Sequence, residues 1–239
     1  MKKNVLIIGA TSGIGRRLAM EYAGQGCRVA ILGRREEKLK EIALTAPDTF
    51  IPCMCDITDT AHAPLRLDEV YATLHPLDLV LIAAGTGELN PELQYRLEEP
   101  TIATNVAGWS CVADWCMNTF ERQGYGHLAV ITSVGGLRGS RTAPAYNASK
   151  AYQMNYIEGL RARTAHQKAK IRITDIRPGL VDTAMAKGEG LFWVIPVEKA
   201  GRRIYQAIEK GRKVAYITRR WRLVALVLQL LPSCLYHKM

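Results

Sequence analysis

A tyrosine and a lysine four positions apart form the pattern in this chain that most directly suggests chemistry. Tyr146 and Lys150 lie at the start of a helix predicted from Tyr146 to His166, where residues four apart share one face. A tyrosine hydroxyl ordinarily loses its proton at a pH of about 10, and a nearby ammonium group lowers that pKa. We therefore predict that Tyr146 exchanges a proton with a carbonyl oxygen and that Lys150 assists it.

Two further polar residues stand where they could act on the same oxygen. Ser133 follows a strand predicted from His127 to Thr132, and its hydroxyl could hydrogen-bond a substrate oxygen as negative charge develops there. Asn105 lies within a helix predicted from Pro100 to Phe120, although asparagine is a poor helix former. Its position suggests a polar task, such as holding a water molecule.

A glycine-rich segment follows the first predicted strand, Val5 to Ile8, and precedes a helix predicted from Ile14 to Gln25. Glycine allows a tight turn and lets backbone N–H groups approach a pyrophosphate, which the N-terminus of the next helix also attracts. A tight turn without a ligand is the alternative. The predicted dinucleotide-binding residues are Gly9, Thr11, Ser12, Gly13, Ile14 and Gly15.

Two arginines follow the second predicted strand, Arg28 to Leu32. NAD-binding sheets usually carry an acidic residue near this point to bind the ribose 2′-hydroxyl. Arg34 and Arg35 could instead hold a 2′-phosphate through charge-assisted hydrogen bonds. We therefore predict that NADP(H) is preferred over NAD(H). The alternative is that both arginines only cover the start of a surface helix, Arg35 to Leu44.

Short apolar runs alternate with helical patterns along the chain. This alternation predicts right-handed βαβ units and an α/β fold, a doubly wound parallel sheet with helices on both faces. Ligands of such sheets bind at the carboxyl ends of the strands. The remaining predicted elements are strands at Phe50–Met54, Leu79–Ala83, Ile171–Ile176 and Val214–Ile217 and a helix at Val197–Glu209.

Together these motifs resemble the short-chain dehydrogenase/reductase family, and they occur in the order typical of that family over nearly the whole chain. The resemblance implies a Rossmann-like sheet with strand order 3-2-1-4-5-6-7 and a homodimer or homotetramer. It also implies a catalytic tetrad in which Tyr146 is the acid or base. The motifs are the glycine loop, Asp56-Ile57, Asn105, Ser133, Tyr146 with Lys150, and Pro178-Gly179 followed by Thr183.

The resemblance assigns further roles to these positions. Lys150 would lower the pKa of Tyr146 and bind the nicotinamide ribose, and Asn105 would hold a water that links Lys150 to solvent. Asp56, beside Ile57, would contact the adenine, and Thr183, after Pro178-Gly179, would contact the nicotinamide amide. One motif departs from the family: Ile-Ala-Ala-Gly, ending at Gly85, replaces a frequent Asn-Asn-Ala-Gly. Gly85 still permits close approach of the cofactor, so we interpret the change as affecting stability.

The C-terminal segment differs in composition from the rest. We expect one catalytic domain over residues 1–218 and a basic, apolar helical extension over 219–239. The apolar stretch from Leu223 to Leu231 is shorter than the ~20 residues that span a bilayer. Arginines and a tryptophan beside leucines suit a helix lying on a membrane surface. The same helix could instead pack on the body or on a partner subunit.

The chain has 239 residues and a formal net charge of +10 at pH 7. That charge does not by itself indicate nucleic acid, because no recognition motif accompanies it. The cysteines and histidines lack metal-ligand spacing, and the first apolar run is too short for a signal peptide. We therefore expect a cytoplasmic protein without a metal, whose C-terminal helix could lie against the inner face of a membrane.

The predicted function is NADPH-dependent reduction of a ketone or aldehyde, or the reverse oxidation. Ala184-Met185 and the apolar run from Gly190 to Ile195 could close over a hydrophobic or lipid-like substrate, or simply pack beneath a loop. An epimerase or dehydratase on the same fold is a weaker alternative. A non-catalytic NADP-binding scaffold or sensor is the other, although it would have no need of Tyr146 and Lys150 together.

Overall fold

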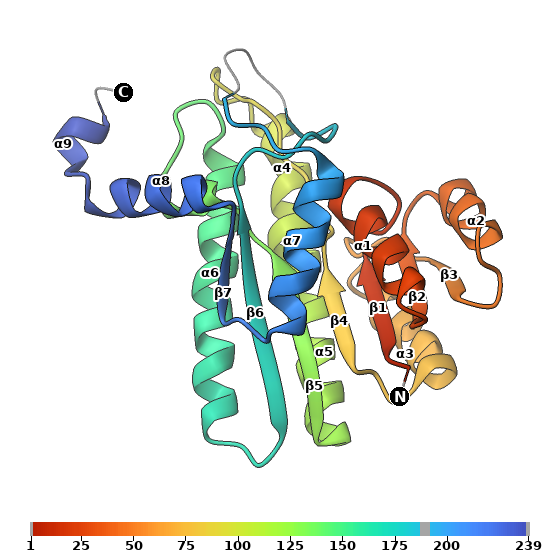
Figure 1. Ribbon diagram of the computed structural model, residues 1–239. Coiled ribbons are helices and arrows are strands. Elements are labelled where there is room, and N and C mark those ends of the chain that lie inside the picture. The colour runs from red at the N-terminus through yellow and green to blue at the C-terminus, as the bar shows by residue number, and fades with distance from the viewer. Residues whose placement is uncertain (1, 187–191, 238–239) are drawn as a thin grey trace.

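The computed structural model describes residues 2–186 and 192–237, which form a seven-stranded parallel sheet in the order β3-β2-β1-β4-β5-β6-β7 (Figure 1). The predicted fold class and strand order are confirmed. The strands are β1 Asn4–Ile8, β2 Arg28–Gly33, β3 Phe50–Met54, β4 Leu79–Ile82, β5 Tyr125–Ile131, β6 Lys170–Pro178 and β7 Val214–Ile217.

Helices cover both faces of the sheet (Figure 1), because its central strands are apolar on both sides. Leu6 of β1 belongs to a core with α3, α5 and α6, whereas Val5 belongs to a second core with α1, α2 and α7. The helices are α1 Gly13–Gly24, α2 Glu36–Leu44, α3 Ala63–Leu74, α4 Tyr95–Ile102, α5 Trp109–Gln123, α6 Pro144–Ala165, α7 Val197–Glu209, α8 Arg219–Leu230 and α9 Ser233–Tyr236.

The helix predicted from Pro100 to Phe120 is more complex than expected. Helical structure begins earlier, at α4, and Pro100 lies inside that helix instead of near its first turn. A π-helical segment, η1 Ala103–Gly108, separates α4 from α5 and contains Asn105. Such wider turns occur often at functional sites. The chain pattern also did not predict α3, whose apolar residues are separated by charged ones.

The C-terminal extension begins with α8, which leaves the sheet directly after β7 and projects to the side of the body (Figure 1). Thr218 makes the sharp turn with a φ of 82°, and its hydroxyl caps the helix by accepting the N–H of Trp221 at 3.4 Å. Trp221 and Ala225 pack against Val134 of the body. Within the described residues, no helix is both long and apolar enough to cross a bilayer.

Candidate active site

A cavity of about 770 Å³ opens at the carboxyl ends of the strands. It gathers residues that lie far apart in the sequence, and of all the predicted site residues only Asn105 is absent from its walls. Those that line it are Gly9, Thr11, Ser12, Gly13, Ile14, Gly15, Arg34, Arg35, Asp56, Ile57, Gly85, Ser133, Tyr146, Lys150, Pro178, Gly179 and Thr183.

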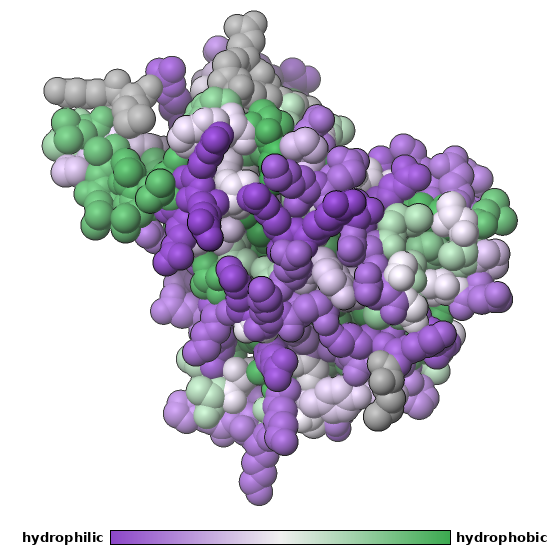
Figure 2. Space-filling view, in the orientation of Figure 1, coloured by the Kyte–Doolittle hydropathy of each residue, from purple (hydrophilic) through white to green (hydrophobic). Residues whose placement is uncertain are grey.

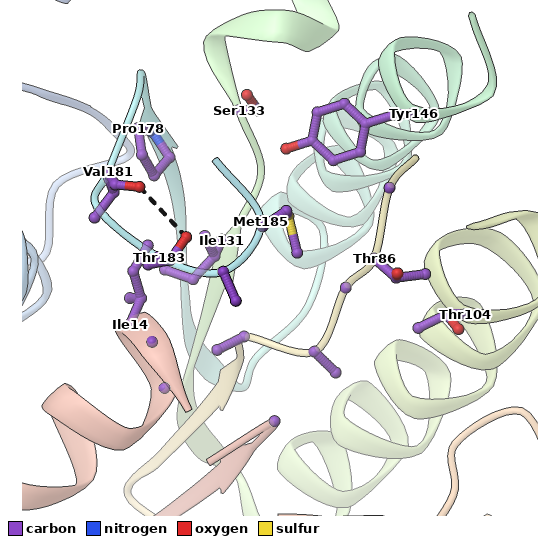
Figure 3. A pocket seen from close by; sticks show the side chains of 18 of the residues that line it. Ile14, Thr86, Thr104, Ile131, Ser133, Tyr146, Pro178, Val181, Thr183 and Met185 are labelled. Carbon is purple, nitrogen blue, oxygen red and sulfur yellow. Dashed lines mark hydrogen bonds between the residues drawn. The ribbon is translucent and has the colours of Figure 1, made fainter. Parts of the chain in front are cut away.

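Tyr146 and Ser133 meet at one end of the cavity. Pro144 begins α6, so Tyr146 lies in its first turn and directs its hydroxyl into the cavity on the side of Ser133 (Figure 3). Ser133 follows β5 and caps a short 3₁₀ helix, where its Oγ accepts the N–H of Gly135 at 3.0 Å. Two hydroxyl groups are thus available to one ligand oxygen.

The pKa of Tyr146 is raised, whereas the sequence led us to expect that it would be lowered. Burial raises the pKa of the Tyr146 hydroxyl, and a hydrogen bond with Ser133 offsets part of that rise. The Lys150 ammonium lies 5.9 Å from the centre of the tyrosine ring and makes its own hydrogen bonds to Ile131 and Gln153. Tyr146 is therefore a protonated phenol at neutral pH.

Lys150 is held by two hydrogen bonds. Its Nζ donates to the carbonyl oxygen of Ile131 and to Oε1 of Gln153, each at 3.0 Å. Burial lowers the pKa of Lys150 to about 8, while the carboxylate of Asp175 acts in the opposite direction. The ammonium form is therefore present at neutral pH and is lost as the pH rises through about 8.

Asn105 acts on the backbone beside the cavity. Its side chain donates to the carbonyl oxygen of Thr86 at 2.7 Å and accepts the N–H of Thr86 at 2.9 Å. It also donates to Oγ of Ser149 at 3.0 Å. These contacts tie η1 to the segment after β4 and to α6. Three of the four hydrogen bonds that the Asn105 amide can make therefore hold these segments together.

Gln153 is a site residue that the sequence motifs missed. Its Nε2 donates to the backbone oxygen of Asn105 at 2.9 Å, while its Oε1 accepts from Lys150. The side chain therefore bridges the two residues for which the resemblance implied a water. The spacing in the sequence could have indicated Gln153, because a polar residue three positions after Lys150 lies on the same helix face.

The glycine loop fits a pyrophosphate. Gly9 has a φ of 89°, and a Cβ atom there would lie 2.5 Å from the backbone nitrogen of Ala84. A Cβ on Gly15 would collide with the carbonyl oxygen of Gly9. Helix α1 begins at Gly13, and the N–H groups of a first helical turn have no partner within the helix. These donors border the cavity and suit a bound anion.

Arg35 closes over the glycine loop. Its guanidinium donates to Oγ1 of Thr11 at 2.5 Å and to Oγ of Ser12 at 2.7 Å. Arg34 lies 3.7 Å from the carboxylate of Asp56, and its own side chain is exposed whereas that of Asp56 is partly buried. Two guanidinium groups thus stand at the cavity end next to β2, where they could hold a phosphate.

Apolar side chains also line the cavity on the side of Ser133, where Trp221 packs against Val134. Met185 reaches it from the loop after Thr183 (Figure 3). Trp221 and Leu228 reach it from α8, a contribution that the sequence patterns did not predict. Phe192 stacks on Trp221 with ring centres 5.5 Å apart. Of the predicted covering loop, Gly190 and Leu191 lie outside the described residues.

Comparison with known proteins identifies relatives along most of the chain. The family model described as short chain dehydrogenase matches residues 3–191. An uncharacterised oxidoreductase of Staphylococcus aureus strain USA300 is 30% identical over 186 residues, covering 77% of this chain and 80% of the relative.

Solved structures share the fold at lower identity. A short-chain dehydrogenase of Burkholderia cenocepacia in complex with NADP has a TM-score of 0.84 at 21% identity, covering 99% of this chain and 97% of that one. A short-chain dehydrogenase/reductase of Burkholderia phymatum in complex with NAD has a TM-score of 0.82 at 18% identity, covering 95% and 92%. On the match of its sequence to the family model, supported by this shared fold, the chain belongs to the short-chain dehydrogenase/reductase family of NAD(P)-dependent oxidoreductases.

Proposed function

We propose that this protein is an NADPH-dependent reductase of a ketone or aldehyde and that it can also run the reverse oxidation. The observation that carries the proposal is the meeting of the Tyr146 and Ser133 hydroxyls beside the buried Lys150 ammonium. A carbonyl oxygen placed between the two hydroxyls would accept two hydrogen bonds, and one of the donors can release its proton.

The proposed roles follow from the protonation states. Tyr146 is protonated at neutral pH, as a tyrosine ordinarily is, and burial raises its pKa further, so it donates a proton to the carbonyl oxygen in the direction of reduction. Ser133 donates a hydrogen bond to the same oxygen as negative charge develops there. The Lys150 ammonium, 5.9 Å from the tyrosine ring, stabilises the phenolate left behind. A nicotinamide held beside Gly85, Pro178 and Thr183 would supply the hydride that reduction of the carbonyl carbon requires.

Asn105 completes the proposed tetrad as a positioning residue, because its side chain holds the backbone of Thr86 beside the cavity.

The alternative to a reductase is a scaffold or sensor that binds NADP without turnover. A buried lysine whose pKa is lowered to about 8 favours the enzyme, because perturbed ionisable groups gather at sites that move protons.

For the cofactor, we propose NADP(H) in preference to NAD(H). Arg34 and Arg35 border the cavity beside the glycine loop, where a 2′-phosphate would gain charge-assisted hydrogen bonds. Asp56 and Ile57 would flank the adenine. Gly85, Pro178, Gly179 and Thr183 would border the nicotinamide half.

For the substrate, we propose a small carbonyl compound with a hydrophobic or lipid-like body, since Met185, Trp221 and Leu228 line the cavity with apolar side chains. The division into a catalytic domain over 1–218 and an extension over 219–239 is part of the proposal. So are a homodimer or homotetramer, a cytoplasmic location with peripheral contact at the inner face of a membrane, and no nucleic-acid partner.

Titration of NADPH and NADH against the wild type and Arg34→Ala tests the cofactor assignment, followed by a screen of carbonyl compounds that monitors NADPH absorbance. We expect NADPH to bind about tenfold or more tightly than NADH, and the variant to lose that difference. If the wild type binds NADPH but reduces no carbonyl compound, the scaffold alternative replaces the reductase. If neither nucleotide binds, the glycine loop does not hold a dinucleotide.

A further inference from the structure

Helix α8 has two apolar faces with different surroundings. Its inner residues Trp221 and Ala225 are buried against the body. Four outer residues at the helical spacing i, i+3, i+4 and i+7 are between 52% and 73% exposed. They are Leu223, Leu226, Val227 and Leu230. Figure 2 shows the hydrophobic surface that results over α8 and α9, where Leu235 is also exposed.

Positive charge lies at one end of this outer face. Arg219, Arg220 and Arg222 lie on the first turn of α8 and are exposed. From Arg219 onward the sequence contains four lysines and arginines and no aspartate or glutamate. A helix with leucines on one face and arginines beside them suits the boundary between headgroups and acyl chains of an anionic bilayer.

The charge also argues against a second copy of the chain as the main occupant. A two-fold contact brings the same surface of two subunits together. The arginines of each first turn would then meet residues 219–237 of the partner, a segment that has no acidic side chain to pair with them. An anionic lipid surface meets the leucines and the arginines at once.

Arg138 fixes the far end of α8 to the body. Its Nε donates to the carbonyl oxygen of Leu228 at 2.7 Å, and its Nη2 donates to that of Leu231. The guanidinium also lies 5.4 Å from the ring centre of Tyr236, whose hydroxyl donates to the carbonyl oxygen of Gly139. These bonds satisfy carbonyl groups that end the helix. The end of α8 is thereby tied to the body, while Leu230 of its last turn stays exposed.

The same helix forms a wall of the cavity, through Trp221 and Leu228. We infer that the outer face of α8 docks on an anionic lipid bilayer and that the cavity takes an apolar carbonyl substrate from that bilayer. The docking surface is defined by Leu223, Leu226, Val227 and Leu230 with the three arginines of the first turn. The statement about substrate rests on the proposed reductase function, whereas the docking surface does not.

Co-sedimentation with vesicles tests the docking surface in the full chain. The probes are vesicles of phosphatidylcholine alone and vesicles with added phosphatidylglycerol. The variant is Leu226→Glu with Leu230→Glu, and the control is Leu44→Glu, at a leucine of α2 that is 78% exposed. We expect anionic vesicles to bind wild type and control about tenfold more tightly than they bind the variant, and binding to weaken with salt.

Three results would overturn the docking surface: equal binding of variant and control, equal binding to both kinds of vesicle, or failure of the wild type to bind. A variant that changes the oligomeric state in ultracentrifugation while keeping its vesicle binding would assign the face to a second copy of the chain.

A kinetic comparison separates this inference from the proposed function. NADPH oxidation is followed with a short, water-soluble aldehyde and with a long-chain aldehyde dissolved in anionic vesicles. We expect the variant to match the control on the soluble aldehyde and to lose about fivefold or more on the vesicle-bound one. Equal rates of variant and control on both would contradict delivery from the bilayer. Vesicle binding without turnover of either aldehyde would contradict the reductase and leave the docking surface standing.

Discussion

The side-chain amide of Gln153 accepts a hydrogen bond from the Lys150 ammonium at 3.0 Å and is itself oriented by its bond to the backbone oxygen of Asn105. Gln153 is completely buried and Lys150 nearly so. Because the amide nitrogen is committed to Asn105, only its oxygen can face the lysine. The helix α6 and the segment η1 therefore fix both the position and the environment of the ammonium.

Replacing Gln153 should move the pH range in which Lys150 is charged. In the wild type the ammonium is present below a pH of about 8 and lost above it. Gln153→Leu removes an acceptor from a buried cation, so the Lys150 pKa falls and the alkaline limb of kcat/KM moves to lower pH. Gln153→Glu places a carboxylate beside the ammonium and moves that limb to higher pH. Profiles that coincide for all three proteins would exclude this positioning role.

Removal of the Tyr146 hydroxyl should separate binding from turnover. Tyr146→Phe keeps the ring but removes the proton donor, so carbonyl reduction should fall by roughly 10²–10⁴-fold. NADPH affinity, measured by fluorescence titration, should stay within about twofold. Tyr152→Phe is the matched control, because that residue lies on the same helix and its hydroxyl bonds Ser110 at 2.8 Å. Equal losses of turnover in the two variants would argue against Tyr146 as the donor.

Adding a single methyl group at Gly9 should disturb the glycine loop and weaken NADPH binding. In Gly9→Ala the new Cβ would meet backbone atoms of Ala84 at a φ of 89°, so the loop must shift and NADPH binding should weaken by about tenfold or more. Gly24→Ala is the control, because a Cβ there meets nothing within 4 Å. We expect the control to bind as the wild type does and to be at least as stable. Isothermal titration measures NADPH affinity, and thermal unfolding measures stability. Similar NADPH affinity in the two variants would contradict the close approach of Gly9 to the backbone of Ala84.

Asp175 should matter for stability. Its carboxylate is fully buried in β6, where it accepts from Thr132 at 2.5 Å and pairs with Arg177 at 2.6 Å. Asp175→Ala leaves the partly buried guanidinium without its partner, which costs about 3–5 kcal/mol and lowers Tm by roughly 10 °C.

A matched variant, Glu69→Gln, breaks an ion pair between exposed side chains, that of Arg66 with Glu69, and should leave Tm nearly unchanged. Thermal unfolding by circular dichroism compares the two variants. A drop in Tm of similar size in both variants would mean that the buried ion pair of Asp175 contributes no more to stability than the exposed pair does.

The sequence predicted those parts of the fold and site that depend on neighbours in the chain. Apolar runs marked the strands because a parallel sheet is buried on both faces. The spacing of Tyr146 and Lys150 placed them on one helix face, and the glycine loop followed from its position between β1 and α1. The strand order came from the resemblance to the family, since alternation alone does not fix which strands pair.

What the sequence did not predict depends on contacts between distant segments. Nothing near Trp221 in the chain shows that α8 returns to the cavity, because that contact is made with Val134. Gln153 carries no motif, and its role depends on the carbonyl of Asn105 being within reach. The raised pKa of Tyr146 likewise results from burial by surrounding elements. The spacing of residues along the chain does not predict that burial.

The two ends of the cavity are built by separate parts of the chain. The loop after β1 and the arginines after β2 border one end, whereas Met185 and two side chains of α8 contribute to the other, together with Ser133 and Tyr146. Substitutions in α8 could therefore change which molecule is accepted while the nucleotide end stays as it is. A protein built in this way can diverge among substrates without having to rebuild its cofactor site, and α8 is the place where such divergence would begin.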